Sequence, residues 1–280
     1  RYIMQKAISK YWPIFVLPTL VAFIIGFIWP FIWGVYLSFQ RFTTVSKTTF
    51  VGIQNYLSVF QDSTFLHAFG FTAAFTVVST VLINVCAFAI ALVLTRGIKG
   101  TNIFRTVFFM PNLIGGILLG YIWQFILGDC MATLGEMTGR TDLFFYWLSN
   151  KQFAFIGLIV VATWQMAGYM MIIYIAGLQS ISDDVLEAAS VDGASYWQTL
   201  FRIRLPLLMP SITICLFLTL SNCFKIYDVN LALTGGGPAN ATEMVSMNIF
   251  NEIFAKSNYG YGQAKAIVFF IIMGVIPMFQ

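Results

Sequence analysis

Long runs without a charged residue alternate along the chain with shorter segments that hold its Lys, Arg, Asp and Glu residues. A helix needs about 20 predominantly apolar residues to cross a bilayer. Five charge-free windows reach that length, at 11–40, 63–95, 106–128, 152–182 and 205–224. A sixth window begins at Ala266 and stops with the chain at Gln280. The pattern predicts an all-α, polytopic membrane protein with six transmembrane helices, the sixth truncated. Because the chain opens on Arg1 rather than Met, we expect both ends to be trimmed.

Composition supports the same class. Of the 280 residues, 59% are hydrophobic and only 9% are charged, whereas soluble domains contain about 25% charged residues. Such a chain cannot cover its surface with charge, so it must contact a lipid bilayer. The net charge is only +4, and the basic residues lie at the edges of apolar runs, which indicates membrane orientation rather than nucleic-acid binding. No soluble domain separates the windows, so we expect 1–280 to form a single transmembrane domain.

Lys and Arg concentrate in alternate segments between the windows. The richer segments are 1–10, 96–105 and 183–204, with eight basic residues. The poorer segments, together about twice as long, are 41–62, 129–151 and 225–265, with seven. Because Lys and Arg favour the cytoplasmic side of a membrane, we expect both termini and the 183–204 segment to be cytoplasmic.

The last of these basic segments predicts two short helices. Ser182 precedes two aspartates, an arrangement typical of a helix start. Gly193 suits the end of that helix, because glycine tolerates a left-handed backbone. Ser195 and Gln198 form a capping-box pattern for a second helix, and Pro206 marks the start of the fifth window. Ala188 and Ala189 have small side chains, so they would give a low-relief surface that a partner protein could approach closely.

The same stretch resembles the EAA loop of ABC-importer permeases. Glu187-Ala188-Ala189 is followed by three residues and Gly193, then by nine residues, Ile203, one residue and Leu205-Pro206. This spacing matches the EAA-x3-G-x9-I-x-LP pattern of that family at each fixed position. The resemblance implies that 180–206 is a cytoplasmic coupling loop that docks on an ATPase subunit. It assigns coupling roles to Glu187, Ala188, Ala189, Asp192, Gly193, Ile203, Leu205 and Pro206.

Other stretches are similar to the carbohydrate branch of the family, the maltose and glycerol-phosphate permeases. They are "FVGIQNYLSVFQD", "MPNLIGG" and "LALTGGGPANAT". Phe71-Thr72 stands where that family often has Asn-Thr. The resemblance implies a type I importer permease in the bacterial cytoplasmic membrane. It also implies a second, different permease subunit, two cytoplasmic ATP-binding subunits and an extracytoplasmic solute-binding protein. ATP and Mg would be bound by the partner ATPase, so this chain would carry no nucleotide site and no catalytic or metal-binding residues.

A few polar residues inside the windows are candidates for the solute pathway, because polar groups in a bilayer must face protein or water. Trp164 and Gln165 together offer an aromatic face and an amide, which suit the C–H surface and hydroxyls of a sugar. The resemblance assigns the pathway to Asn112, Gly116, Gln165, Met166, Thr219, Asn222 and Cys223. The alternative for each polar residue is an interhelical hydrogen bond, which we favour for Asn84 and Gln124. The Gly116-x-x-x-Gly120 pattern likewise favours close helix packing.

Two other functional classes fit less well. A self-contained carrier usually shows inverted repeats or intramembrane charges, and no charge falls in the five complete windows. A membrane-embedded enzyme needs a general acid or base, and no cluster of His, Asp or Glu lies within these windows. We therefore expect an importer subunit for a sugar or oligosaccharide, with a sugar phosphate, a polyol or another small polar solute as the alternative.

Overall fold

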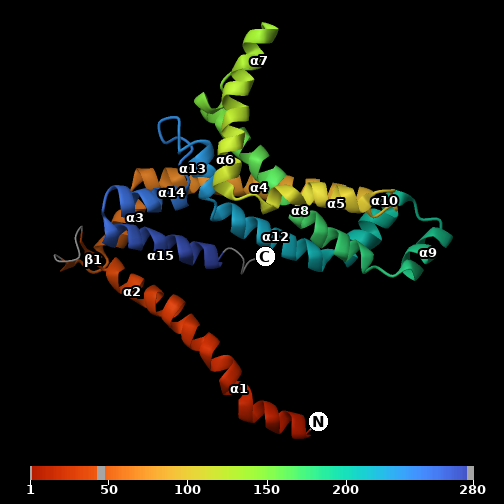
Figure 1. Cartoon of the computed structure of the whole chain (residues 1–280), viewed down its shortest axis with the longest axis horizontal. Coiled ribbons are helices and arrows are strands. Elements are labelled where there is room, and N and C mark those ends of the chain that lie inside the picture. Colours follow the sequence, from red (N-terminus) through yellow and green to blue (C-terminus); the bar gives the residue numbers. More distant parts are fainter. Residues whose placement is uncertain (1, 43–47, 276–280) are drawn as a thin grey trace. The chain divides into compact units, whose positions relative to one another are not determined.

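The structure, a computed structural model, describes residues 2–42 and 48–275. Its elements are helices and one small sheet, in which β1 (Gln40–Arg41) pairs antiparallel with β2 (Thr49–Phe50) (Figure 1). The chain packs as two compact units. One runs up to Asp62 and includes Ile249–Ile271, and the other contains Ser63–Asn248.

The first unit contains the first predicted span. Its helical elements are α1 (Tyr2–Phe23), a π-helical turn (Ile24–Ile28), α2 (Trp29–Ser38), α3 (Gln54–Gln61), a second π-helical turn (Asn251–Ala255) and most of α15 (Tyr259–Val275). Asn55 fixes α3 against the sheet, because its amide donates to the carbonyls of Ser38 and Gln40 at 2.8 and 2.9 Å. Gly260 lets α15 approach the Gln40 carbonyl more closely than any side chain would allow.

A buried ion cluster completes this unit. Lys265 of α15 is fully buried, with its Nζ 2.8 Å from a carboxylate oxygen of Asp62 and 2.9 Å from one of Glu252. Lys256 also pairs with Glu252, at 3.1 Å. Burial alone would raise the pKa of Glu252, but hydrogen bonds from Lys265 and Lys256 and the charge of Lys265 hold it below its ordinary value. The cluster therefore keeps Glu252 ionised although it is almost inaccessible to water.

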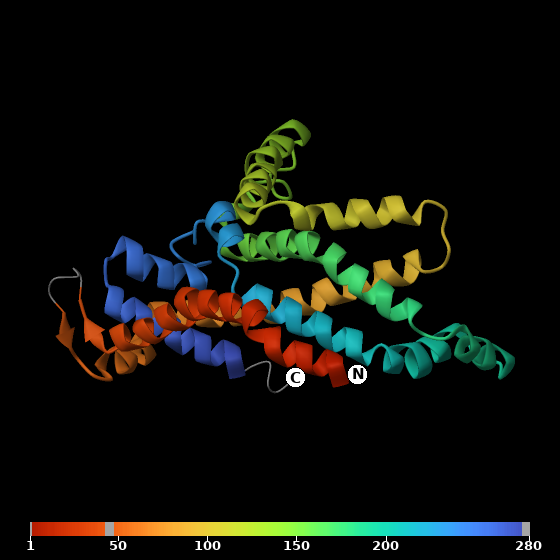
Figure 2. The same cartoon turned by 60° about the horizontal axis from the view of Figure 1, so that its bottom comes forward.

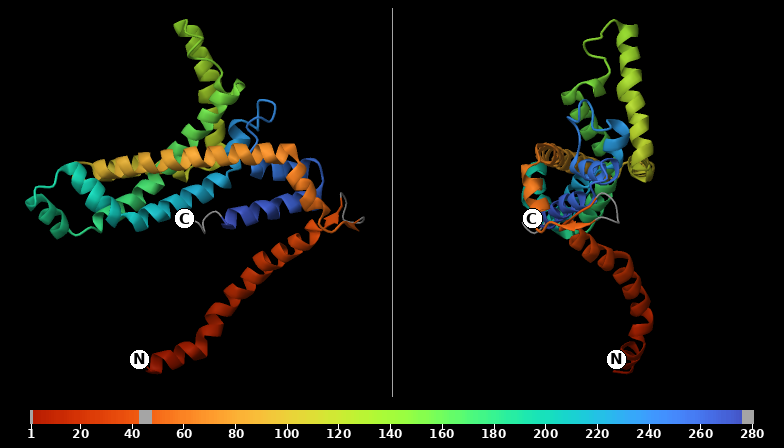
Figure 3. Two further views of the ribbon diagram at one scale, coloured as in Figure 1. Left: turned by 180° about the vertical axis from the view of Figure 1, so that it is seen from behind. Right: turned by 90° about the vertical axis from the view of Figure 1, so that its left-hand side faces the viewer.

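The second unit is a helix bundle. Its central helices are α4 (Ser63–Leu94), α8 (Lys151–Gln179) and α12 (Met209–Phe224), which lie side by side in Figures 1 and 3. The shorter elements are α5 (Thr101–Phe109), a 3₁₀ turn (Met110–Leu113), α6 (Gly116–Phe125), a π turn (Ile126–Cys130), α7 (Met131–Thr138), a 3₁₀ turn (Trp147–Ser149), α9 (Asp183–Val191), α10 (Tyr196–Thr199), a π turn (Leu200–Arg204), α11 (Leu205–Leu207), α13 (Asp228–Leu233) and α14 (Val245–Phe250).

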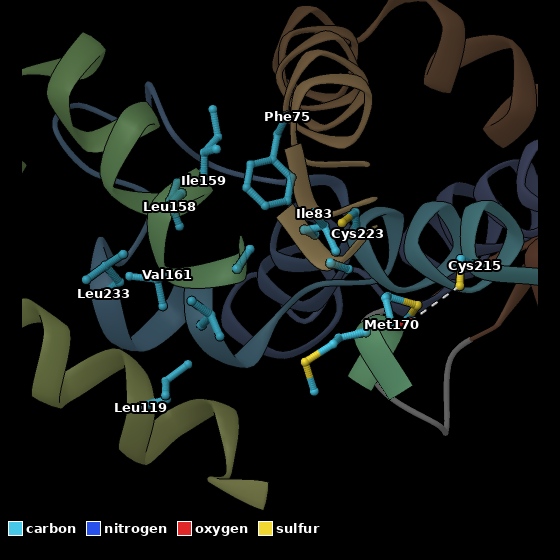
Figure 4. Close-up of a cluster of buried hydrophobic side chains, with 14 of the residues drawn as sticks. Phe75, Ile83, Leu119, Leu158, Ile159, Val161, Met170, Cys215, Cys223 and Leu233 are labelled. Carbon is cyan, nitrogen blue, oxygen red and sulfur yellow. Dashed lines mark hydrogen bonds between the residues drawn. The ribbon is translucent and has the colours of Figure 1, made fainter. Parts of the chain in front are cut away.

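Apolar side chains and close backbone contacts hold the bundle together. Figure 4 shows the buried core, in which Cys223 of α12 lies beside Ile83 of α4 and the Cys215 thiol reaches the Met170 carbonyl at 3.8 Å. Gly168 of α8 lies directly against the Phe108 carbonyl of α5, where any larger residue would clash with the backbone. Glycine at this point permits α5 and α8 to pack in direct contact.

The predicted spans agree with the helices in most places. Trp12–Ser38, Ser63–Leu94 and Lys151–Gln179 are long and apolar enough to cross a membrane. The fifth window falls in a bent pair, Tyr196–Leu207 and Met209–Phe224, whose axes differ by 69°. The sixth corresponds to the shorter apolar helix α15, which begins at Tyr259 rather than Ala266, and residues 276–280 of that window lie outside the described residues.

The position predicted for the third span, 106–128, is wrong. The helix breaks after Phe109, passes through the 3₁₀ turn and becomes extended at Ile114 and Gly115 (ψ 128° and 140°). Pro111 supplies one physical reason, because it has no N–H for the helical ladder. The membrane-length segment is instead Gly116–Thr138. It includes Asp129 and Glu136 near its far end, which the predicted window did not.

Candidate coupling segment and solute pathway

The predicted coupling segment is a helix followed by a sharp turn. Asp183 and Asp184 occupy the first turn of α9, where negative charge is favourable. The backbone of Ser182 has the extended conformation of an N-cap, although its hydroxyl makes no capping hydrogen bond. Glu187 and Ala188 are exposed, whereas Ala189 faces inward and is buried. Of the three EAA residues, the first two are thus available to a partner.

Gly193 ends α9 for a conformational reason. Its φ is +76°, a left-handed backbone that costs residues with a side chain about 1–2 kcal/mol. The N–H of Gly193 donates to the Ser190 carbonyl at 3.1 Å, and that of Ala194 donates to the Ala189 carbonyl at 2.9 Å. This pair of bonds is a Schellman motif. A Cβ at Gly193 would meet nothing within 4 Å, so the backbone angle, not crowding, requires glycine.

The second short helix starts as the sequence predicts. Ser195 and Gln198 form a reciprocal capping box, with bonds of 2.7 and 3.3 Å. The helix continues to Leu207, beyond the predicted boundary at Pro206, and the chain then turns by 69° into α12. Pro210 cannot donate to the Pro206 carbonyl, which helps to place the bend there. Ile203 and Leu205 are partly buried, and Pro206 is exposed.

A hydrogen bond and a cation–π contact join this second helix to another part of the bundle. An Nη atom of Arg96, just after α4, donates to the Tyr196 hydroxyl at 2.6 Å, and its guanidinium carbon lies 4.9 Å from the ring centroid. In each view the coupling segment and the turn after α4 lie at the same end of the bundle (Figures 1, 2 and 3). The sequence suggests no such partner for Tyr196, because the two residues are 100 positions apart.

Several predicted pathway residues gather at the break in the third span. The Gln165 amide of α8 donates to the Ile114 carbonyl at 3.3 Å, beside the extended residues. Trp164 stacks edge-on against Trp123 of α6 with centroids 5.5 Å apart, and it is 43% exposed. Asn112, in the 3₁₀ turn, is partly exposed. This group presents an amide, an aromatic ring and polar backbone beside one another, while Met166 packs against the apolar core.

Gly116 and Gly120 serve helix packing, as the small-residue pattern predicts. A Cβ at Gly116 would lie 2.8 Å from the Asp228 Cβ, and one at Gly120 would lie 2.5 Å from the Ala232 Cβ. Both glycines therefore admit α13 against α6. Gly116 is partly exposed, but its main contact is with protein.

Thr219 and Cys223 belong to a different group. Both are fully buried on α12. The Asn84 amide donates one hydrogen to the Thr219 hydroxyl at 3.0 Å and the other to the Thr80 carbonyl. The Asn84 carbonyl oxygen accepts a hydrogen bond from the Tyr174 hydroxyl at 2.7 Å. We call Asn84, Tyr174 and Thr219 the polar seam. It joins α4, α8 and α12, so a solute would reach Thr219 only if these helices separated.

The remaining polar candidates have separate positions. Asn84 makes the interhelical hydrogen bonds predicted for it, whereas no hydrogen bond from partly buried Gln124 is found among the described residues. Asn222 is exposed on α12. Thr72, the residue of the Phe71-Thr72 pair that matches the family pattern, accepts a hydrogen bond from the Val245 N–H at 3.0 Å and so anchors the start of α14.

Sequence reasoning misses the contribution of Tyr174. It lies in an apolar run with no polar neighbour in the sequence that would mark it, and only the pairing of α8 with α4 brings it to Asn84. The glycine-rich stretch after α13 forms a turn. Gly235 and Gly236 have positive φ, and the Asn230 side chain donates to the Thr242 carbonyl across the turn at 2.8 Å.

A bundle of membrane-length helices with a pair of short helices at one end is the architecture of a polytopic membrane protein. Comparison with known proteins gives the family. The model described as "Binding-protein-dependent transport system inner membrane component" matches residues 90–279. The chain belongs to this family and is thus a multi-pass inner-membrane permease component, not an ATPase.

Individual relatives match nearly the whole chain. It is 42% identical over 270 residues to the probable starch degradation products transport system permease protein AmyD of Thermoanaerobacterium thermosulfurigenes, covering 96% of this chain and 92% of that protein. It is 33% identical to the multiple sugar-binding transport system permease protein MsmF of Streptococcus mutans serotype c, covering 99% and 96%. A bacterial ABC transporter involved in the import of the acidic polysaccharide alginate has the same fold, with a TM-score of 0.82, 22% identity and coverage of 99% and 96%.

Proposed function

We propose that the chain is one transmembrane half of an ATP-driven importer for a carbohydrate, a sugar or an oligosaccharide. The 42% identity over 96% of the chain to a permease named for starch degradation products carries this proposal. The amide and aromatic groups at the break in the third span support it, because they suit sugar hydroxyls and C–H faces. The eight candidate pathway residues are all uncharged, which favours a neutral sugar over a sugar phosphate.

The proposed assembly contains a second permease subunit of different sequence, two cytoplasmic ATP-binding subunits and an extracytoplasmic solute-binding protein. ATP and Mg belong to the ATP-binding subunits. Residues 1–280 act as a single permease domain with both termini in the cytoplasm, and 180–206 is its coupling loop. In this assembly Glu187 and Ala188, exposed on α9, meet the ATP-binding subunit.

The coupling loop transmits movement to the bundle. When the ATP-binding subunits close, α9 moves with them and pulls on α10 through the rigid turn at Gly193. The bend at Leu208 passes this motion to α12. Because the polar seam binds α12 to α4 and α8, the three helices tilt together as a rigid body, and the pathway at the break in the third span opens outward.

Uptake measurements test the proposal. In cells that lack only this chain, we expect uptake of labelled maltodextrins to be lost and to return when the chain is restored. In cells that also lack the ATP-binding subunits, restoring the chain alone should not return it. Glycerol 3-phosphate is the charged comparison solute. Transport that continues without the ATP-binding subunits, or that is restored for glycerol 3-phosphate alone, would contradict the proposal.

A further inference from the structure

An apolar groove lies between the end of α4 and α5, and none of its lining residues is a candidate pathway residue. Its volume is about 410 Å³, within the range of roughly 300–1,000 Å³ typical of ligand sites. Every lining residue is apolar, the main ones being Ile90, Val93, Leu94, Ile98, Phe104 and Phe108. A groove with this lining suits a hydrocarbon chain rather than a sugar.

The turn at one end of the groove is strongly basic. Segment 96–105 contains Arg96, Lys99 and Arg105 and no acidic residue. The basic and groove-lining residues are neighbours in the sequence, since Ile98 lies beside Lys99 and Phe104 lies beside Arg105. Along the chain, the groove-lining residues of this segment therefore alternate with basic residues.

Arg105 gives an independent indication of a missing acceptor. Its Nε is buried, yet it has no hydrogen-bond partner in the described part of the chain. A buried donor without an acceptor is unfavourable, so an acceptor from another molecule would be stabilising here. Lys99 is exposed, and Arg96 uses one of its guanidinium donors for Tyr196, which leaves the other donors of its guanidinium for a ligand.

We propose that this groove is a binding site for an anionic phospholipid, with an acyl chain along the groove and the phosphate at Lys99 and Arg105. Charge complementarity selects this occupant, because an apolar helix of another subunit would fill the groove but leave the cations unmatched. Basic pockets beside membrane helices recognise anionic headgroups in this way. The site goes beyond sugar import, and its test needs neither solute nor ATP, so either inference can fail while the other stands.

The test uses the complete transporter in nanodiscs with tail-labelled photoreactive phosphatidylglycerol or phosphatidylcholine, followed by mass spectrometry of peptides from 89–108. We expect the anionic probe to label this region in clear excess over the neutral one. Lys99→Gln should lower the anionic labelling roughly fivefold, and adding Arg105→Gln should lower it about as much again. The control pair Arg140→Gln and Lys151→Gln removes two exposed charges elsewhere and should change nothing.

Two further variants examine the groove itself. Ala89→Phe fills the groove without changing charge, so it should reduce labelling by both lipids. Since Arg105 is half-buried, the exposed Lys99 provides the variant that does not risk folding. Equal labelling by the two lipids would overturn the proposal. Displacement of the lipid by millimolar glycerol 3-phosphate would also overturn it. Efficient crosslinking of Val93→Cys to the second permease subunit would overturn it as well, because the groove would then be a subunit interface.

Discussion

The coupling segment and the polar seam are both polar parts of a largely apolar bundle, but different kinds of contact stabilise them. The turn after α9 is formed by hydrogen bonds between residues at most five apart, at Gly193 and Ala194. The seam joins Asn84 to Tyr174 and Thr219, which are 90 and 135 residues away. The first can therefore form and move as a local unit, whereas the second exists only when three helices have packed.

This difference separates two kinds of defect. Changes in the coupling segment should leave the bundle folded and interrupt transmission to it. Changes in the seam should weaken the bundle first and transport only as a consequence. Thermal stability and the ratio of ATP hydrolysed to solute imported distinguish the two outcomes, and the variants below are ordered by the size of the expected effect.

Asn84→Leu should produce the largest loss of stability. It leaves the buried Tyr174 hydroxyl without its acceptor and removes a donor to Thr219, at a cost of about 1–3 kcal/mol. We expect a lower unfolding temperature in detergent and fewer folded molecules in the membrane. Those that fold should keep a normal ratio of ATP to solute. Unchanged stability would show that the seam does not hold the three helices.

Gly193→Val should have the opposite signature. Valine at φ +76° is strained by about 1–2 kcal/mol in the turn alone, so the unfolding temperature of the bundle should stay near that of the native protein. ATP hydrolysis should become uncoupled from uptake. Gly193→Asn is the matched control, because Asn tolerates this backbone better and should retain most of the transport. Equal loss in both variants would mean that bulk, not backbone angle, is excluded here.

Tyr196→Phe tests the contact that joins the coupling segment to Arg96, just after α4. It removes the hydrogen bond from Arg96 but keeps the ring beneath the guanidinium, so a loss of about 0.5–1 kcal/mol at this exposed contact is expected. The solute imported per ATP should fall modestly with no change in unfolding temperature. Arg96→Gln removes both the hydrogen bond and the cation, so in this variant the solute imported per ATP should fall further. A phenylalanine variant as impaired as Arg96→Gln would assign the whole effect to the hydroxyl.

Ser79→Ala should have the smallest effect. Ser79 of α4 is fully buried, and its hydroxyl has no hydrogen-bond partner among the described residues. Removing an unsatisfied buried hydroxyl is close to neutral or slightly stabilising, so we expect a change within about 0.5 kcal/mol. The comparison with Asn84→Leu then shows that the stability of α4 comes from bonded polar groups and not from polar residues as such. A marked loss in Ser79→Ala would contradict this.

The sequence predicts those parts of the molecule that depend on neighbours in the chain. The capping box at Ser195 and the left-handed Gly193 follow from short spacings and are both present. Charge-free length likewise predicts the spans at Ser63–Leu94 and Lys151–Gln179 within a few residues. The close approach of α6 to α13 follows from two glycines four residues apart.

Features that depend on distant residues were not predictable. The break in the third span is a different case, because Pro111 is a local cause of it, but a charge-free window takes no account of proline and so placed the span too early. The partner of Tyr196 and the role of Tyr174 require knowledge of which helices meet. The coupling and pathway roles themselves stay predictions, since they concern partners and a solute.

The Lys265 cluster has a consequence for how the protein is made. Asp62 leaves the ribosome early, and the cation that it shares with Glu252 arrives only with the last helix described, α15. Because the Lys265–Asp62 ion pair joins residues far apart in the sequence, it can form only after α15 has been made, so the packing of the first unit is completed last.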